Sequence, residues 1–165
     1  MGENMRKKEK RIGIIMAIVM SAAMGIIASI VIAGNPEAKT PPFPVFCAIN
    51  LIESIIVGLL VAFIIPLGRI GKSLADKTGA TPPSMKFNLI NSIPYAIGNA
   101  VIVSAVVSFI NIAQAHASIP SEEAPPLMAM WISGWLPLLL PGIAVGYVLA
   151  VIISPIVVGI VMGRR

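Results

Sequence analysis

The sequence predicts an all-α membrane protein with four transmembrane helices, arranged as two parallel helical-hairpin repeats with both termini in the cytoplasm. Composition is the first observation: 57% of the 165 residues are hydrophobic and 12% are charged, whereas soluble domains are about 25% charged. The mean hydropathy is +0.94. The second observation is that four separate apolar stretches are each long enough to cross a bilayer, which takes about 20 helical residues. The length suits one membrane domain over 1–165.

The four predicted spans hold almost no charge, and proline-rich segments separate the first from the second and the third from the fourth. Proline cannot continue a helix and stiffens a linker. The first span is longer than the apolar region of a signal peptide, so we expect an uncleaved helix. The expected spans run from about Ile12 to Ala33, Pro44 to Leu67, Phe87 to Ala113 and Trp135 to Met162.

Basic residues are concentrated on one side of the predicted topology. Only Lys39, among 12 lysines and arginines, falls on the other side. Positive residues favour the cytoplasmic side of short loops, so the bias places both termini there. It also accounts for the net charge of +5 without a nucleic-acid partner. The residues on the first side are Arg6, Lys7, Lys8, Lys10, Arg11, Arg69, Lys72, Lys77, Lys86, Arg164 and Arg165.

The last apolar stretch, 127–162, is longer than one straight crossing needs at about 1.5 Å per residue. Pro137 and Pro141 interrupt it near the outer side, so we expect 127–136 to lie in the membrane interface. The crossing would then begin near Pro137, with Pro155 as a second kink. Tryptophan favours the headgroup level, and the two expected anchors are Trp131 and Trp135.

The two halves of the chain, about 11–70 and 86–163, share one plan. Each has a span, a proline-rich connection and a returning span. The segment Val57–Pro66 in the second span is similar to Val145–Pro155 in the fourth when one inserted residue aligns the prolines. Both halves enter from the same side, so the axis that relates them should follow the membrane normal, unlike the in-plane axis of inverted repeats.

The fourth span carries Trp131, Trp135, Pro137, Pro141 and Pro155 and is followed by Arg164 and Arg165. In this pattern it resembles the second helix of a family of small bacterial inner-membrane proteins, which have two helices and no characterised function. The resemblance implies that this chain is a fusion of two such hairpins, multi-pass in the bacterial cytoplasmic (inner) membrane. It implies no activity.

Glu53 is the only acidic or basic residue (Asp, Glu, Lys, Arg or His) within the four apolar cores, roughly 12 Å below the outer surface at 1.5 Å per residue. A carboxylate there is costly unless it is protonated, paired or hydrated. It marks either a proton or cation pathway or a protonated hydrogen-bond donor between helices. Asn50 and Ser54 share its side of the helix, and Gly58 continues that side and permits close helix approach.

A stripe of polar side chains follows helical spacing along the third span and, with Glu53, is expected to line a polar cavity. Ordinary hydrogen bonding between helices is the alternative. The stripe holds Asn88, Asn91, Ser92, Tyr95 and Asn99, and a second, opposite polar face holds Ser104, Ser108 and Asn111. The residues expected to form a substrate or ion pathway are Glu53, Asn50, Ser54, Asn91, Tyr95 and Asn99.

Other chemistry has little support. Met16, Met20 and Met24 step by four along the first span, where core filling is favoured over soft-metal binding. His116 has no cysteine or second histidine near it in the sequence. The sequence contains no catalytic constellation and no phosphate-binding glycine loop. We therefore expect no enzyme activity, no cofactor and no metal site.

The leading hypothesis is a small transporter or permease-like protein in which Glu53 is the binding or coupling carboxyl. Its partners would be the lipid bilayer, a small-molecule or cation ligand, and a second copy, because four helices rarely enclose a pathway alone. The alternative is a non-transporting accessory, assembly or sensing subunit of a membrane complex.

Cysteine labelling tests the predicted topology. In a chain that also carries Cys47→Ala, an impermeant maleimide added outside intact cells should label Lys39→Cys and Ser121→Cys, because both connections are predicted to be external. Ser73→Cys should react only after the membrane is permeabilised. The opposite labelling pattern would refute the orientation.

Overall fold

The computed structural model describes residues 3–35, 40–82, 84–120 and 124–163. Within these ranges every regular element is helical, and four helices are long and apolar enough to cross a membrane. These candidate spans are Arg6–Ala33, Phe43–Ile64, Met85–Ala117 and Leu127–Met162, so the four predicted spans are confirmed as helices of sufficient length. The labelling positions Lys39 and Ser121, and also Arg164 and Arg165, lie outside the described residues.

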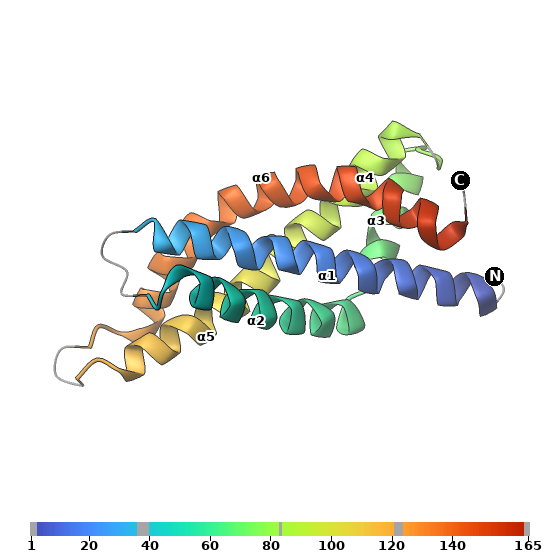
Figure 1. Cartoon of the computed structure of the whole chain (residues 1–165). Helices are drawn as coiled ribbons and strands as arrows, with labels where there is room; N and C mark the ends of the chain where they lie inside the picture. Colours follow the sequence, from blue (N-terminus) through green and yellow to red (C-terminus); the bar gives the residue numbers. More distant parts are fainter. Residues whose placement is uncertain (1–2, 36–39, 83, 121–123, 164–165) are drawn as a thin grey trace.

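The four spans pack side by side, and α1 (Glu3–Ala33) lies between α2 (Phe43–Ile64) and α6 (Leu127–Met162) (Figure 1). The beginning of α1 and the end of α6 lie at one end of the bundle, which we call the terminal end. The helices turn from α1 to α2 and from α5 to α6 at the opposite, loop end. The third span crosses behind α1 in three parts, which are α4 (Met85–Ile97), the π-helix η1 (Gly98–Val103) and α5 (Ser104–Ala117).

Small residues bring α1 and α2 into close contact. A methyl group added at Gly58 would overlap the Oγ atom of Ser21, and one added at Gly25 would lie 2.8 Å from the carbonyl oxygen of Asn50. Glycine and serine allow helix backbones to approach at such positions. The predicted role of Gly58 in close helix packing is confirmed.

The methionine stripe of α1 fills the core of the bundle. The exposed fractions of Met16 and Met20 are 0%, and that of Met24 is 3%. Met16 and Met20 pack in one cluster with Tyr95 and Ala150. Unbranched methionine side chains adapt to irregular gaps between helices, so the expected core-filling role of the stripe is confirmed.

A π-helical segment interrupts the α-helical geometry of the third span. Pro94 lies inside α4, and η1 begins four residues later. Proline has no N–H group to donate to the preceding turn, so helices commonly deviate near it. A π turn holds more residues than an α turn, and therefore side chains beyond it are rotated by roughly 100° relative to an uninterrupted α-helix. This rotation determines where the polar side chains of α5 point.

The connection between the second and third spans, expected as a loop, contains the helix α3 (Leu67–Lys77). The second span accordingly ends at Ile64, earlier than expected. Gly71 and Ala75 are buried, and a methyl group at Gly71 would meet the carbonyl oxygen of Asn91 in α4. The helix is stabilised because the face that carries Gly71 and Ala75 packs on α4. This tertiary contact cannot be predicted from the short, charged sequence of the helix.

The fourth apolar stretch is one continuous helix, so the predicted break at its first proline is wrong. Trp131 and Trp135 stack with ring centroids 5.4 Å apart, and Phe109 of α5 packs edge-on against Trp131 at 5.7 Å. The Phe109–Trp131 contact holds the first turns of the helix against α5, and a proline removes only one backbone hydrogen bond. The helix contains Pro137, Pro141 and Pro155.

Replacing Gly58 by alanine should destabilise the bundle. The added methyl group would force α1 and α2 apart at Ser21, and overpacking of this kind costs about 1–3 kcal/mol. The measurement is the thermal unfolding midpoint of the purified chain in detergent.

The matched control is Gly13→Ala in α1, where no atom lies within 4 Å of an added methyl group. Alanine favours a helix over glycine by about 1 kcal/mol, so this control should melt at the same or a higher temperature. Equal destabilisation of both variants would contradict the close-packing argument.

Candidate intramembrane site around Glu53

Glu53 lies at the middle of α2, at the border between the buried and exposed sides of that helix. Asn50 is fully buried and Ser54 is 2% exposed. On the other side, Ile52 and Ile56 are 58% and 54% exposed. Glu53 itself is partly buried. Its carboxyl group is therefore in contact with the polar interior of the bundle and also open towards its surface.

The hydrogen-bond partner of Glu53 is Asn111 of α5. The Asn111 amide nitrogen donates to Oε2 of Glu53 at 3.3 Å, to Oδ1 of Asn50 at 2.9 Å and to the carbonyl oxygen of Val107 at 3.0 Å. An amide group has two N–H donors for these three acceptors. The bond to Glu53 is the longest of the three, so it is the weakest hydrogen bond that Asn111 donates.

The network continues from Asn50 into α1. The amide nitrogen of Asn50 donates to Oγ of Ser29 at 3.1 Å, and Ser29 donates to the carbonyl oxygen of Gly25 at 2.8 Å. Hydrogen bonds between polar side chains on different membrane helices contribute about 0.6–2 kcal/mol each. The chain from Glu53 through Asn111 and Asn50 to Ser29 therefore ties α2, α5 and α1 together; we call these four residues the Glu53 network.

The Glu53 network surrounds very little empty space. The enclosed volume beside it is about 10 Å³, and a buried water needs roughly 10–15 Å³ on this measure. This space beside Asn50 and Asn111 therefore has room for about one water. The space is lined by Met24, Ala28, Ile32, Asn50, Ser54, Val103, Ser104, Val107, Ser108, Asn111 and Leu138.

The residues expected to form one pathway lie in separate places in the structure. Asn50 joins Glu53 in one network, and Ser54 lines the same small space. Asn99, which lies in η1, accepts a hydrogen bond from Ser21 of α1 at 3.0 Å and donates to the carbonyl oxygen of Tyr95 at 2.9 Å. It forms a separate polar contact nearer the terminal end.

Asn91 and Tyr95 face α3 rather than Glu53. A methyl group added at Gly71 would meet Asn91, and one added at Gly68 would meet the Tyr95 hydroxyl group. Both side chains are at least 91% buried. The contact with α3 therefore takes these two residues away from the Glu53 network, although their helical spacing is as expected.

Sequence reasoning placed Asn111 on the face of the third span opposite the predicted pathway and did not connect it to Glu53. A constant rotation of about 100° per residue was assumed along the span, whereas the η1 turn adds a rotation of similar size. Ser29 and Ser21 were also missed, although each lies four residues from Gly25 and shares its helix face.

The tryptophans of α6 donate to α5. Trp131 Nε1 donates to Oγ of Ser108 at 3.0 Å, and Trp135 Nε1 donates to Oγ of Ser104 at 2.9 Å. These bonds explain why the second polar face of the third span carries serines. The placement of the indole rings at the headgroup level stays a prediction.

Metal-binding groups do not gather in the part of the chain that the structure describes. No set of three or more histidine, cysteine, aspartate or glutamate residues there is arranged to hold a metal ion. His116 Nε2 forms a hydrogen bond with the carbonyl oxygen of Pro125 at 2.8 Å. Comparisons with family models, with curated proteins and with solved structures find no match, so the resemblance to the two-helix family stays a prediction.

Removing Asn111 should loosen the bundle. In Asn111→Leu the buried Asn50 oxygen loses its amide donor, and an unsatisfied buried acceptor costs about 1–3 kcal/mol. The thermal unfolding midpoint in detergent should fall accordingly.

Gln114→Leu is the control, because Gln114 lies almost one helical turn further along α5 and is exposed. It changes an amide to the same apolar side chain without removing a buried bond, so its midpoint should be near that of the wild type. A wild-type midpoint for Asn111→Leu would show that the Glu53 network adds nothing to stability.

Proposed function

We propose that this chain is a small transporter of the bacterial inner membrane in which Glu53 binds a proton or cation during the transport cycle. The observation that carries the proposal is the position of its carboxyl group. It lies midway along an apolar helix and is partly open to the surface. Among the described residues, its hydrogen bond is the shared one of 3.3 Å from Asn111. A carboxyl that served only to join helices would be expected to hold its partner more firmly.

The polar contacts of the bundle support this role at two levels. The Glu53 network joins three helices on the loop side of Asn99, and the Ser21–Asn99 bond lies inside the bundle closer to the terminal end. Polar groups at successive depths give a proton or cation alternative oxygen ligands along the bundle. Ionisable groups inside membrane segments commonly mark such pathways.

The small size of the space beside Asn50 and Asn111 bears on how transport would occur. A pathway requires either that α2 moves relative to α5 or that a second copy completes it. We therefore include a homodimer in the proposal. The same tight packing favours the second candidate function, a non-transporting accessory, assembly or sensing subunit, in which the Glu53 network only holds helices together.

The finer architecture belongs to the same proposal. We place the terminal end in the cytoplasm because the basic residues of the start of α1 and of α3 gather there. Two hairpin repeats related by an axis along the membrane normal are supported by Gly58 and Gly146. Gly58 packs on Ser21 of the first span. Gly146 packs on Ala96 of the third span and also on Met20 of the first, so each glycine contacts the preceding span of its own half, although Gly146 does not do so exclusively.

The test compares Glu53→Gln with Glu53→Leu in liposomes. Proton flux into vesicles under an imposed membrane potential is followed with an internal pH-sensitive dye. Glutamine keeps the size and hydrogen bonding of the side chain but cannot titrate, so Glu53→Gln should abolish the flux and retain the wild-type melting temperature. Glu3→Gln, an exposed carboxyl outside the apolar core, is the matched control and should conduct like the wild type.

A purely structural role gives a different pattern. Glu53→Gln would then behave like the wild type in both assays, and Glu53→Leu would melt lower because of a lost interhelical bond of about 1 kcal/mol. That pattern, or a wild-type flux no greater than that of empty liposomes, would refute proton transport through Glu53.

A further inference from the structure

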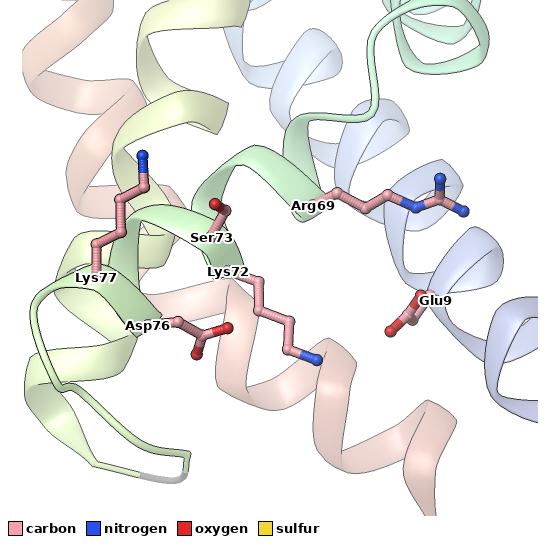
Figure 2. Close-up of a pocket in the computed structure, with 6 residues that line it drawn as sticks. All are labelled: Glu9, Arg69, Lys72, Ser73, Asp76 and Lys77. Carbon is pink, nitrogen blue, oxygen red and sulfur yellow. The ribbon is translucent and has the colours of Figure 1, made fainter. Parts of the chain in front are cut away.

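An open hollow lies near the terminal end of the bundle, between α3 and the first turns of α1 (Figure 2). Its volume is about 520 Å³, far larger than the space of about 10 Å³ beside Asn50 and Asn111. In Figure 2 the side chains of Arg69 and Lys72 extend from α3 towards α1, and the carboxyl group of Glu9 points back at them. The lining residues are Glu9, Arg69, Lys72, Ser73, Asp76 and Lys77.

The helix that forms one wall of the hollow has three distinct sides. Gly71 and Ala75 are buried against the bundle. Ile70 and Leu74 are 46% and 38% exposed, although they are large and apolar. The remaining side carries the exposed charged residues that line the hollow. A helix with an exposed apolar edge beside a charged face is suited to the boundary between acyl chains and headgroups.

Arg69, Lys72 and Lys77 supply the positive charge of the hollow. Among the described residues, no salt bridge involves Arg69, Lys72 or Lys77; the ion pair found there joins Lys7 to Glu3. Arginine and lysine in such positions bind phosphate, arginine through two N–H groups at once. Cations outnumber carboxylates in the lining, so an anionic ligand is favoured over a neutral one.

We propose that this hollow is a binding site for an anionic phospholipid of the membrane leaflet at the terminal end. Arg69 and Lys72 bind the phosphodiester, and headgroup hydroxyl groups donate to the carboxylates of Glu9 and Asp76. The exposed edge formed by Ile70 and Leu74 contacts the acyl chains. This edge is the reason for assigning a lipid rather than a soluble phosphate, because basic pockets beside membrane helices are suited to anionic headgroups. The proposal is independent of Glu53.

Native mass spectrometry of the full chain, with dioleoylphosphatidylglycerol as the probe, tests the site. The wild type should retain this lipid, and Arg69→Gln combined with Lys72→Gln should bind it about tenfold more weakly. Dioleoylphosphatidylcholine should bind weakly to both. Lys7→Gln combined with Arg11→Gln removes two charges from the side of α1 opposite Glu9 and should bind phosphatidylglycerol like the wild type. Equal losses in the two double variants would overturn the proposal in favour of general surface charge.

Thermal melting in detergent separates a lipid from a soluble ligand. Phosphatidylglycerol should raise the melting temperature of the wild type, and glycerol 3-phosphate at the same concentration should not. Ile70→Ser combined with Leu74→Ser should reduce the stabilisation by lipid. Stabilisation by glycerol 3-phosphate would overturn the assignment to lipid. Lys72→Gln alone, one exposed substitution, provides the same comparison if the double variant does not fold, and unchanged lipid stabilisation of this variant would refute the site.

Discussion

The close approach of α1 and α2 is the constraint on which the interior depends. Gly25 and Gly58 allow the two backbones to meet, and that contact carries Asn50 into a position with no exposure. A buried amide must find partners inside the protein, because an apolar solvent offers none. Ser29 and Asn111 supply them. The packing of small residues is therefore the cause of the burial of Asn50. The polar network satisfies the amide group that this packing buries.

The π turn in the third span allows one helix to serve two polar neighbours. Near the start of η1, Asn99 accepts a hydrogen bond from Ser21 of α1; beyond η1, Asn111 donates to Asn50 of α2. In an uninterrupted α-helix these two side chains would point about 120° apart around the helix axis. Among the described residues, no buried side-chain nitrogen or oxygen lacks a hydrogen-bond partner. The irregular turn thus contributes to polar satisfaction in a setting where an unpaired group costs several kcal/mol.

The sequence allowed prediction of the four spans, of the buried methionine stripe and of the close packing at Gly58, because hydropathy and small-residue spacing act locally. It did not allow prediction of the Asn111–Glu53 contact, which depends on the rotation introduced by η1. The helix α3 was missed for another reason. Leu67, Ile70 and Leu74 do follow helical spacing, but eleven residues are marginal without the support of α4.

Asn111 has two N–H donors for three acceptors, and this shortage links the state of Glu53 to the rest of the bundle. An ionised carboxylate accepts hydrogen bonds about twice as strong as those of a neutral group. On ionisation Glu53 would therefore compete better for Asn111, and the buried oxygen of Asn50 would lose part of its share. Protonation would reverse this preference. In the proposed transporter, the occupancy of Glu53 therefore changes which of two α2 side chains is bonded to α5, because the two N–H groups of Asn111 cannot fully satisfy Asn50, Glu53 and the Val107 carbonyl group at once.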